Sequence, residues 1–369
     1  MATVVSGQMT RRWALVGAGT AILCLLPALV AGLPVPASPL SAAQLRARIL
    51  TSADVPYQGY AESDVNLDLP ALPDLGDVTA LLDGTTDQYA WYRSAGQWRA
   101  DVLTTAGEDD TYVTSRGTFT WDYASDLMTQ IQGSQPVRLP RAADLLPPVL
   151  ATRLLGFAGR ADRISRLPTR RIAGIDAAGL RLVPASKATT IGAVEIWADP
   201  VNGLPVAVNL YGRRAGAPLL TSRFLDVSLR TPSVADVTPD PAPGVGFTVT
   251  GLADVSGVLG GFGPPLPGRL AGFGRVASPV GLPDIAAYGD GFARFVVLPL
   301  PERTGAEAMD TASSAGASIQ IQGGTAVLVT TPLLTVLLAS PPAGPVYLLT
   351  GAVTARLLYA AATQLLAAG

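Results

Sequence analysis

The chain has 369 residues and nearly balanced charge, with 26 basic and 28 acidic side chains. A nucleic-acid-binding surface needs a strong excess of basic residues, so this composition gives no reason to expect a nucleic-acid partner. Histidine is absent and Cys24 is the only cysteine. These two absences exclude histidine bases, histidine metal ligands, Ser-His-Asp triads, intrachain disulfides and thiolate clusters.

Motifs for other kinds of catalysis are missing as well. Carboxylate-only or serine–lysine chemistry stays open in principle, but the sequence contains no nucleophile motif and no metal-ligand spacing. The Gly-rich stretch 251–274 lacks a Walker lysine and the strand–glycine–helix context of a dinucleotide-binding loop. We therefore expect no enzymatic activity, no catalytic residues, no metal and no cofactor.

The N-terminal segment carries the pattern of a membrane anchor. An uncharged run, 13–40, follows Arg11 and Arg12. This run exceeds the ~20 apolar residues that span a bilayer, and the two arginines favour a cytoplasmic N-terminus. A cleaved signal peptide is the alternative, because Val35-Pro36-Ala37 resembles a cleavage site. In either case we expect residues 1–40 to place the rest of the chain outside the cytoplasm.

A helix and a strand are expected next. Residues 41–54 begin with a serine suited to cap a helix, and Leu45 and Ile49 follow at helical spacing. Residues 57–67 alternate as a strand with one apolar face. The charges between 54 and 87 are all acidic but lack the spacing of a calcium-binding loop, so a solvated surface is expected.

Short alternating segments between 88 and 132, separated by small and polar residues, predict an antiparallel meander. We expect one face of this meander to hold Trp98, Ala100, Val102, Phe119, Trp121 and Tyr123. A helix, or a pair of helical turns broken at Pro147-Pro148, is expected to follow over 142–159. Strands near 171–183, 193–199, 204–212 and 219–229 would complete a sheet of roughly nine to eleven strands.

The clearest hairpin is "VEIWADPVNGLPVAVNLYG", which starts at Val194. Asn202-Gly203 favours a tight turn because both residues tolerate positive φ. Period-two alternation places Ile196 on one face of the first arm, and Val208 and Leu210 on one face of the return arm. Such a hairpin covers either a packed core or a cavity.

Two stretches resemble a known family. "QWRADVLTTAGEDDTYVTSRGTFTWDYASDLMTQI", with Gly117-Thr118-Phe119-Thr120-Trp121-Asp122-Tyr123 at its centre, resembles the LolA-type lipoprotein carriers and the first domain of the RseB/MucB sigma-factor regulators. "WADPVNGLPVAV" at 197–208 is similar to a hairpin of the same family. The resemblance implies an α+β fold with a LolA-like unclosed antiparallel β-barrel, helices in its mouth and an apolar cavity for acyl chains.

The resemblance also supplies candidate binding residues. The lipid-cavity candidates are Trp98, Val102, Phe119, Trp121, Ile196, Val208 and Leu210. Burying an acyl chain of about 16 carbons would contribute on the order of 10 kcal/mol before the costs of association. Packing of these side chains in a solid core is the competing interpretation of each of them.

An arginine cluster follows the interrupted helix. Arg163, Arg166, Arg170 and Arg171 are candidates for binding an anionic head group or an acidic partner, because guanidinium binds phosphate in a bidentate fork. A solvated loop and strand edge is the alternative. We therefore divide the first part of the chain into 1–40, anchor or signal peptide, and 41–230, a LolA-like lipid-binding domain.

A Pro-rich linker is expected at 231–246, followed by a smaller α+β domain at 247–369. Gly289-Asp290-Gly291 marks a hairpin, 318–340 and 346–353 read as strands, and 354–368 as a helix. This pattern resembles the C-terminal domain of the RseB/MucB proteins, which helps to contact an anti-sigma factor.

The sequence as a whole predicts an extracytoplasmic protein of the LolA/RseB type that sequesters acyl chains in an apolar cavity. The expected partners are a lipid or an acylated protein, and the membrane. The alternative is a regulator of an extracytoplasmic sigma factor that binds a membrane anti-sigma factor. The second domain favours the regulator, whereas the aromatic-rich sheet favours the lipid-binding protein.

Overall fold

The computed structural model describes residues 35–67, 80–105, 107–132, 140–241, 245–251, 263–276 and 285–368, with residues 13, 16, 17 and 20. Most of the expected anchor or signal peptide, and much of the Gly-rich stretch, lie outside the described residues. Among the residues that are described, no helix has the length and apolar character needed to cross a bilayer.

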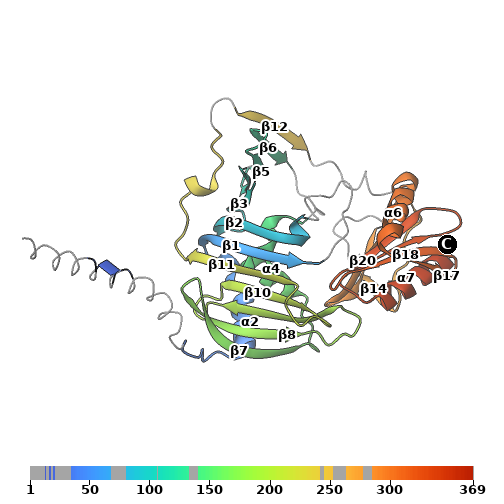
Figure 1. Cartoon of the computed structure of the whole chain (residues 1–369), viewed down its shortest axis with the longest axis horizontal. Helices are drawn as coiled ribbons and strands as arrows, with labels where there is room; N and C mark the ends of the chain where they lie inside the picture. Colours follow the sequence, from blue (N-terminus) through green and yellow to red (C-terminus); the bar gives the residue numbers. More distant parts are fainter. Residues whose placement is uncertain are drawn as a thin grey trace, which may run out of the picture.

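Twelve strands form the first sheet (Figure 1): β1 Tyr57–Asn66, β2 Asp83–Ser94, β3 Gln97–Thr104, β4 Gly107–Thr114, β5 Gly117–Asp122, β6 Leu127–Gln132, β7 Arg163–Ile172, β8 Ile175–Val183, β9 Ile191–Ala198, β10 Pro205–Gly212, β11 Leu220–Ser228 and β12 Gly246–Gly251. Their order is β12-β6-β5-β4-β3-β2-β1-β11-β10-β9-β8-β7. Within the described chain the edge strands β12 and β7 pair with no further strand, so the sheet is unclosed, as expected.

The strand β12 comes from a later part of the chain than its neighbours. It pairs in parallel with β6, with Phe247 opposite Met128 and Thr248 opposite Thr129. All other neighbouring strands of the first sheet are antiparallel. The segment that the sequence assigns to the start of the second domain thus adds a strand to the first sheet.

Two helices cover the β7–β11 part of this sheet: α2 (Ala42–Leu50) and α4 (Pro147–Gly156). The start of α2 is a capping box, in which the Gln44 amide donates to Ser41 Oγ and the Ser41 amide donates to Gln44 Oε1. Helix α4 begins at Pro147, because proline has no amide hydrogen that needs an acceptor at the first helical position. The prolines therefore separate α4 from the 3-10 helix η2 (Ala142–Leu145), which agrees with the expected pair of helical turns and not with one continuous helix.

The hairpin of β9 and β10 is confirmed. Val208 lies opposite Ile196 and Leu210 opposite Val194, and Gly203 adopts a φ of +82° in the turn. A second hairpin differs from the expected strand at 171–183. The chain turns at Ala173-Gly174, both at positive φ, so β7 and β8 are two antiparallel strands.

Eight strands form the second sheet: β13 Arg269–Leu270, β14 Phe273–Val276, β15 Ala286–Asp290, β16 Ala293–Leu300, β17 Ala317–Ile321, β18 Gly324–Thr330, β19 Thr335–Ser340 and β20 Val346–Gly351. Their order is β13-β14-β15-β16-β20-β19-β18-β17. The expected closing helix is α7 (Ala355–Ala368), and a helix that was not predicted is α6 (Glu302–Ala315). They cover opposite faces, because α7 packs around Leu337 and α6 around Leu338.

Backbone hydrogen bonds and one aromatic contact join the two sheets. Thr189 and Val353 form an isolated antiparallel bridge, flanked by bonds from the Thr190 amide to the Ala352 carbonyl (3.1 Å) and from the Thr354 amide to the Ala188 carbonyl (2.8 Å). The rings of Phe157 and Phe292 also meet, with centroids 6.0 Å apart. The loop 188–190 of the first sheet is thereby fixed to the segment after β20.

Candidate functional site

A cavity of about 450 Å³ lies between the β1–β6 part of the first sheet and the chain that leads into α4. This volume falls in the range of about 300–1,000 Å³ typical of small-molecule sites. Its lining is mostly apolar and includes Tyr57, Ala90, Tyr92, Trp98, Val113, Thr118, Ile131, Ala143, Leu146 and Val149.

Strand register explains why these side chains meet. Tyr57 lies opposite Tyr92, Tyr92 opposite Trp98, and Trp98 opposite Val113. The row continues through Thr118 to Ile131 on β6. Directly opposed residues of neighbouring antiparallel strands share a face, so this row forms one continuous wall.

The other wall has a charged end. The 3-10 helix η2 (Ala142–Leu145) and the first turns of α4 contribute Ala143, Leu146 and Val149, followed by Arg153. Arg153 Nη2 lies 3.0 Å from Asp144 Oδ1, and the Arg141 amide donates to Asp144 Oδ2 at 3.0 Å. The Arg153 side chain is 52% exposed. The cavity therefore offers an apolar surface with arginines at one end, which suits an amphiphile.

Of the predicted cavity residues, all of which the structure describes, Trp98 lines the cavity. Val102 lies further along β3 and is half-buried. The expectation that Phe119 and Trp121 share the face of Trp98 is wrong, because Phe119 lies opposite Tyr112 and Trp121 opposite Asp110. They form a separate cluster with Tyr112 and Met128 on the other face of the sheet.

The hairpin candidates lie in a packed core. Ile196 and Val208 are fully buried and Leu210 is 4% exposed. They belong to one cluster with Leu45 of α2 and Leu154 of α4. One part of the sheet is therefore filled by helices, whereas the part beside it leaves a cavity.

The arginine candidates lie on β7, at the edge of the sheet farthest from β12. Arg163 is exposed, and Arg166 donates to the Ser38 carbonyl. Arg170 lies 4.2 Å from the ring centre of Trp197, and Arg171 pairs with Asp176 at 2.7 Å. The structure brings the four together on one strand, but they do not line the cavity described above.

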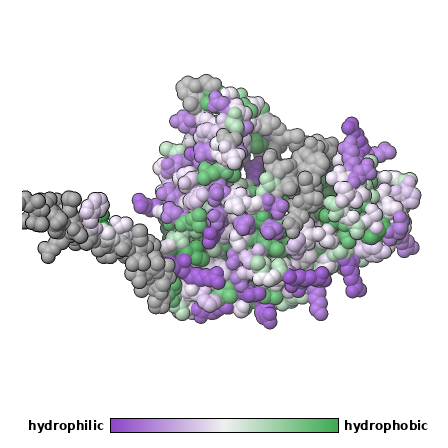
Figure 2. All heavy atoms as spheres, in the orientation of Figure 1, coloured by the Kyte–Doolittle hydropathy of each residue, from purple (hydrophilic) through white to green (hydrophobic). Residues whose placement is uncertain are grey.

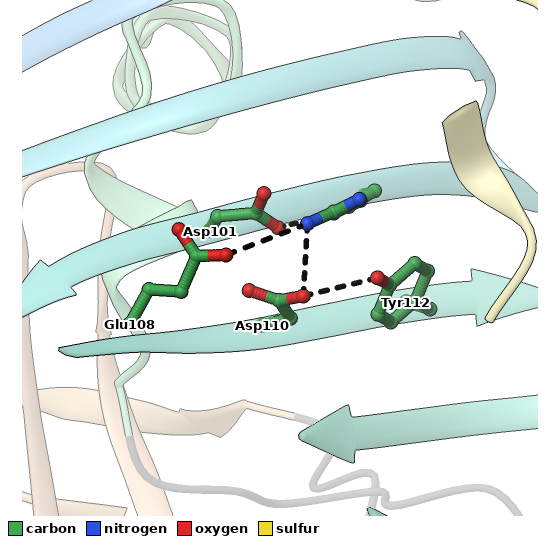
Figure 3. Close-up of polar contacts among 5 residues, drawn as sticks. Asp101, Glu108, Asp110 and Tyr112 are labelled. Atoms are coloured by element: carbon green, nitrogen blue, oxygen red, sulfur yellow. Dashed lines mark hydrogen bonds and ion pairs between the residues drawn. The ribbon is translucent and has the colours of Figure 1, made fainter. Parts of the chain in front are cut away.

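Three carboxylates that could hold a metal meet on the face opposite the Trp98 row (Figure 3): Asp101, Glu108 and Asp110, with ligand atoms within 4.8 Å of one another. Arg99 lies between them, with Nε 2.5 Å from Asp101 Oδ1 and Nη2 2.9 Å from Asp110 Oδ2. Tyr112 donates to Asp110 Oδ2 at 3.0 Å. Because the guanidinium already compensates the negative charge, this cluster fits a buried ionic network better than a metal centre.

Burial raises the pKa of Asp101 to about 7, despite the neighbouring Arg99. An aspartate in an unfolded chain titrates near 3.9. Between about pH 4 and 7 the unfolded chain therefore loses a proton that the folded chain keeps. The free energy of unfolding should fall with rising pH in this window, by up to about 1.4 kcal/mol per unit. Asp101→Asn should reduce this slope, because asparagine keeps the shape and stays neutral. Burial also raises the pKa of Asp110, so part of the slope should remain. Urea unfolding across the window measures the change.

The control for this experiment is Asp226→Asn, which removes an exposed carboxylate on β11 of the same sheet. It should keep the slope of the wild-type chain. An Asp101→Asn chain whose stability changes with pH as steeply as that of the wild type would show that Asp101 is ionised throughout.

Several cavity residues were missed by the sequence interpretation: Tyr57, Tyr92, Val113, Ile131 and Val149. The alternation within each strand was visible, and it placed Tyr57 on an apolar face. The missing information was the register between strands, since a shift of one residue exchanges the two faces.

The chain is similar to known proteins among the solved structures. No protein-family model matches the chain, and no curated protein sequence does. The MucA/MucB complex of Pseudomonas aeruginosa has a TM-score of 0.48 at 17% identity, over 88% of this chain and 96% of that chain. A crystal structure of MucB alone gives 0.43 at 18% identity, over 87% and 96%. A LolA superfamily protein from Nitrosomonas europaea gives 0.24 at 12% identity, over 55% and 99%. Both groups that the sequence resembles are thus represented among these structures.

Proposed function

We propose that this protein is an extracytoplasmic lipid- or lipoprotein-binding protein that holds an acyl chain in the cavity between β1–β6 and the start of α4. The observation that carries this proposal is the continuous row from Tyr57 to Ile131 facing an unfilled space of about 450 Å³. Each methylene buried there would contribute about 0.8 kcal/mol. An acyl chain needs no polar catalyst, which agrees with the absence of histidine.

The tyrosines of the cavity support an apolar ligand. Tyr57 and Tyr92 stack with centroids 5.2 Å apart, and the Tyr92 hydroxyl donates to the Ala53 carbonyl at 2.7 Å. The Tyr92 hydroxyl is thus already bonded, and the ring offers its carbon surface. Arg141 and Arg153 at the charged end would lie near an anionic or polar head group.

Native mass spectrometry of the full chain, purified in a mild detergent, tests this proposal. We expect acyl species to remain bound after the detergent is removed in the gas phase. A displacement titration with a fluorescent fatty acid should then give saturable binding with one site. A chain that is free of acyl species and gives no saturable signal would contradict the proposal.

A second candidate function is regulation of an extracytoplasmic sigma factor through a membrane anti-sigma factor. The observation in its favour is the second sheet, which is held to the first by the Thr189–Val353 bridge and the Phe157–Phe292 contact. A simple carrier of acyl chains has no need of this addition. The similar MucB was solved in complex with MucA.

Co-purification separates the two functions. An anti-sigma factor encoded beside this chain should be retained by the tagged full chain in membrane extracts if the second function holds. Failure to retain it, together with a positive acyl-binding result, would leave the lipid-binding function alone.

A further inference from the structure

The edge strand β7 lies beside the end of the uncharged N-terminal run. Ser38 is 7% exposed; its amide donates to Thr169 Oγ1 at 3.2 Å, and its carbonyl accepts from Arg166. In Figure 1 the blue segment before α2 meets the sheet next to β7. The structure thus fixes where the chain leaves the uncharged run, and that place is the β7 edge.

The charged side chains at this edge are mostly basic. Between 160 and 171 the sequence has five arginines and a single acid, Asp162. Asp162 accepts from the amides of Gly159 and Ala185, each at 2.8 Å. In the described chain Arg160, Arg163, Arg166 and Arg170 form no ion pair with a carboxylate. Figure 2 shows hydrophilic side chains along the lower rim of the molecule, where β7 lies.

We propose that the β7 edge rests on a membrane surface rich in anionic phospholipid, with Arg160 and Arg163 facing the phosphates. Arg166, which donates to the Ser38 carbonyl, and Arg170, which stacks on Trp197, add positive charge beside them. Two observations point to this occupant. Ser38, at the end of the uncharged run, is bonded to β7, and the four arginines at or just before this strand pair with no carboxylate in the described chain. Basic side chains beside a membrane-inserted segment are attracted by anionic lipid. This inference uses the expected membrane location of the N-terminal run and does not depend on the acyl cavity.

The arginines also suit β7 as an edge strand, which pairs with no further strand in the described chain. An exposed strand edge invites pairing with other chains, and charged side chains prevent it. A lipid surface tolerates those charges, whereas a second strand does not. The occupant is therefore a head-group layer and not another β-strand.

Amide hydrogen exchange on the full chain in lipid nanodiscs tests the proposal. We expect slower exchange over 160–172 in phosphatidylglycerol than in phosphatidylcholine, and loss of the difference in about 1 M salt, where the Debye length is about 3 Å. The double substitution Arg160→Gln and Arg163→Gln should lower the ratio of docked to undocked chains about fivefold per arginine. Neither side chain has a partner in the described residues, so the fold should not change.

The matched control is Arg214→Gln with Arg230→Gln, which removes two exposed arginines outside β7. It should keep the lipid-dependent protection. Equal exchange in the two lipids, or an equal loss of protection in the control, would overturn the proposal. So would aggregation of the β7 variant combined with no lipid dependence in the wild type, which would show that the arginines only protect the strand edge. Acyl binding should be the same in all these chains, so failure of this inference is distinguishable from failure of the proposed function.

Discussion

Val149→Trp should abolish tight acyl binding while the protein stays folded. Val149 is half-buried on the first turn of α4 and lines the cavity, so an indole at this position would project into empty space. If it displaces about four methylenes of the ligand, the loss is about 3 kcal/mol, or roughly 200-fold in Kd. Displacement of a fluorescent fatty acid measures this change, and circular dichroism checks that the fold is retained.

Val201→Trp is the matched control for this experiment. Val201 lies in the turn between β9 and β10 and is 81% exposed, so the same substitution there adds an indole to solvent. Its acyl affinity should equal that of the wild type. Wild-type affinity in the Val149→Trp chain would show that the ligand binds elsewhere.

Trp197→Ala should be the most destabilising single substitution that we consider. Trp197 is 1% exposed, its Nε1 donates to the Pro168 carbonyl at 3.2 Å, and Arg170 stacks on its ring. Gly179 faces this indole, since a Cβ there would lie 2.8 Å from Trp197 Nε1. Removing such a buried aromatic side chain costs about 3–5 kcal/mol. Urea unfolding should show a loss of this size.

Trp197→Phe separates the hydrogen bond from the packing. Phenylalanine keeps an aromatic ring under Arg170 but loses the Nε1 donor, and a typical hydrogen bond contributes about 1 kcal/mol. We expect this chain to lie between the wild type and Trp197→Ala. An alanine variant as stable as the phenylalanine variant would contradict a packing role for the ring.

Local features were predictable because local chemistry determines them. The β9–β10 hairpin follows from Asn202-Gly203 and period-two alternation, and α2 from the cap at Ser41. The unclosed sheet was expected from a resemblance. The Gly289-Asp290-Gly291 hairpin also formed as predicted.

Features that depend on long-range pairing were not predictable. The face of Phe119 depends on how β5 aligns with β4, where Thr114 lies opposite Gly117. The parallel pairing of β12 with β6 has no local signal at all. Helix α6 was missed because its sequence is rich in small and polar residues, and Gly305 is its only residue that is fully buried.

The parallel strand β12 has a structural consequence. Ile131 of β6 belongs to the cavity wall, and its backbone partner is Thr250 of β12. In chain order β12 is the last strand of the first sheet, and β13, the first strand of the second sheet, comes next. The wall of the cavity and the start of the second half of the chain therefore share one hydrogen-bonded strand pair, β6 with β12.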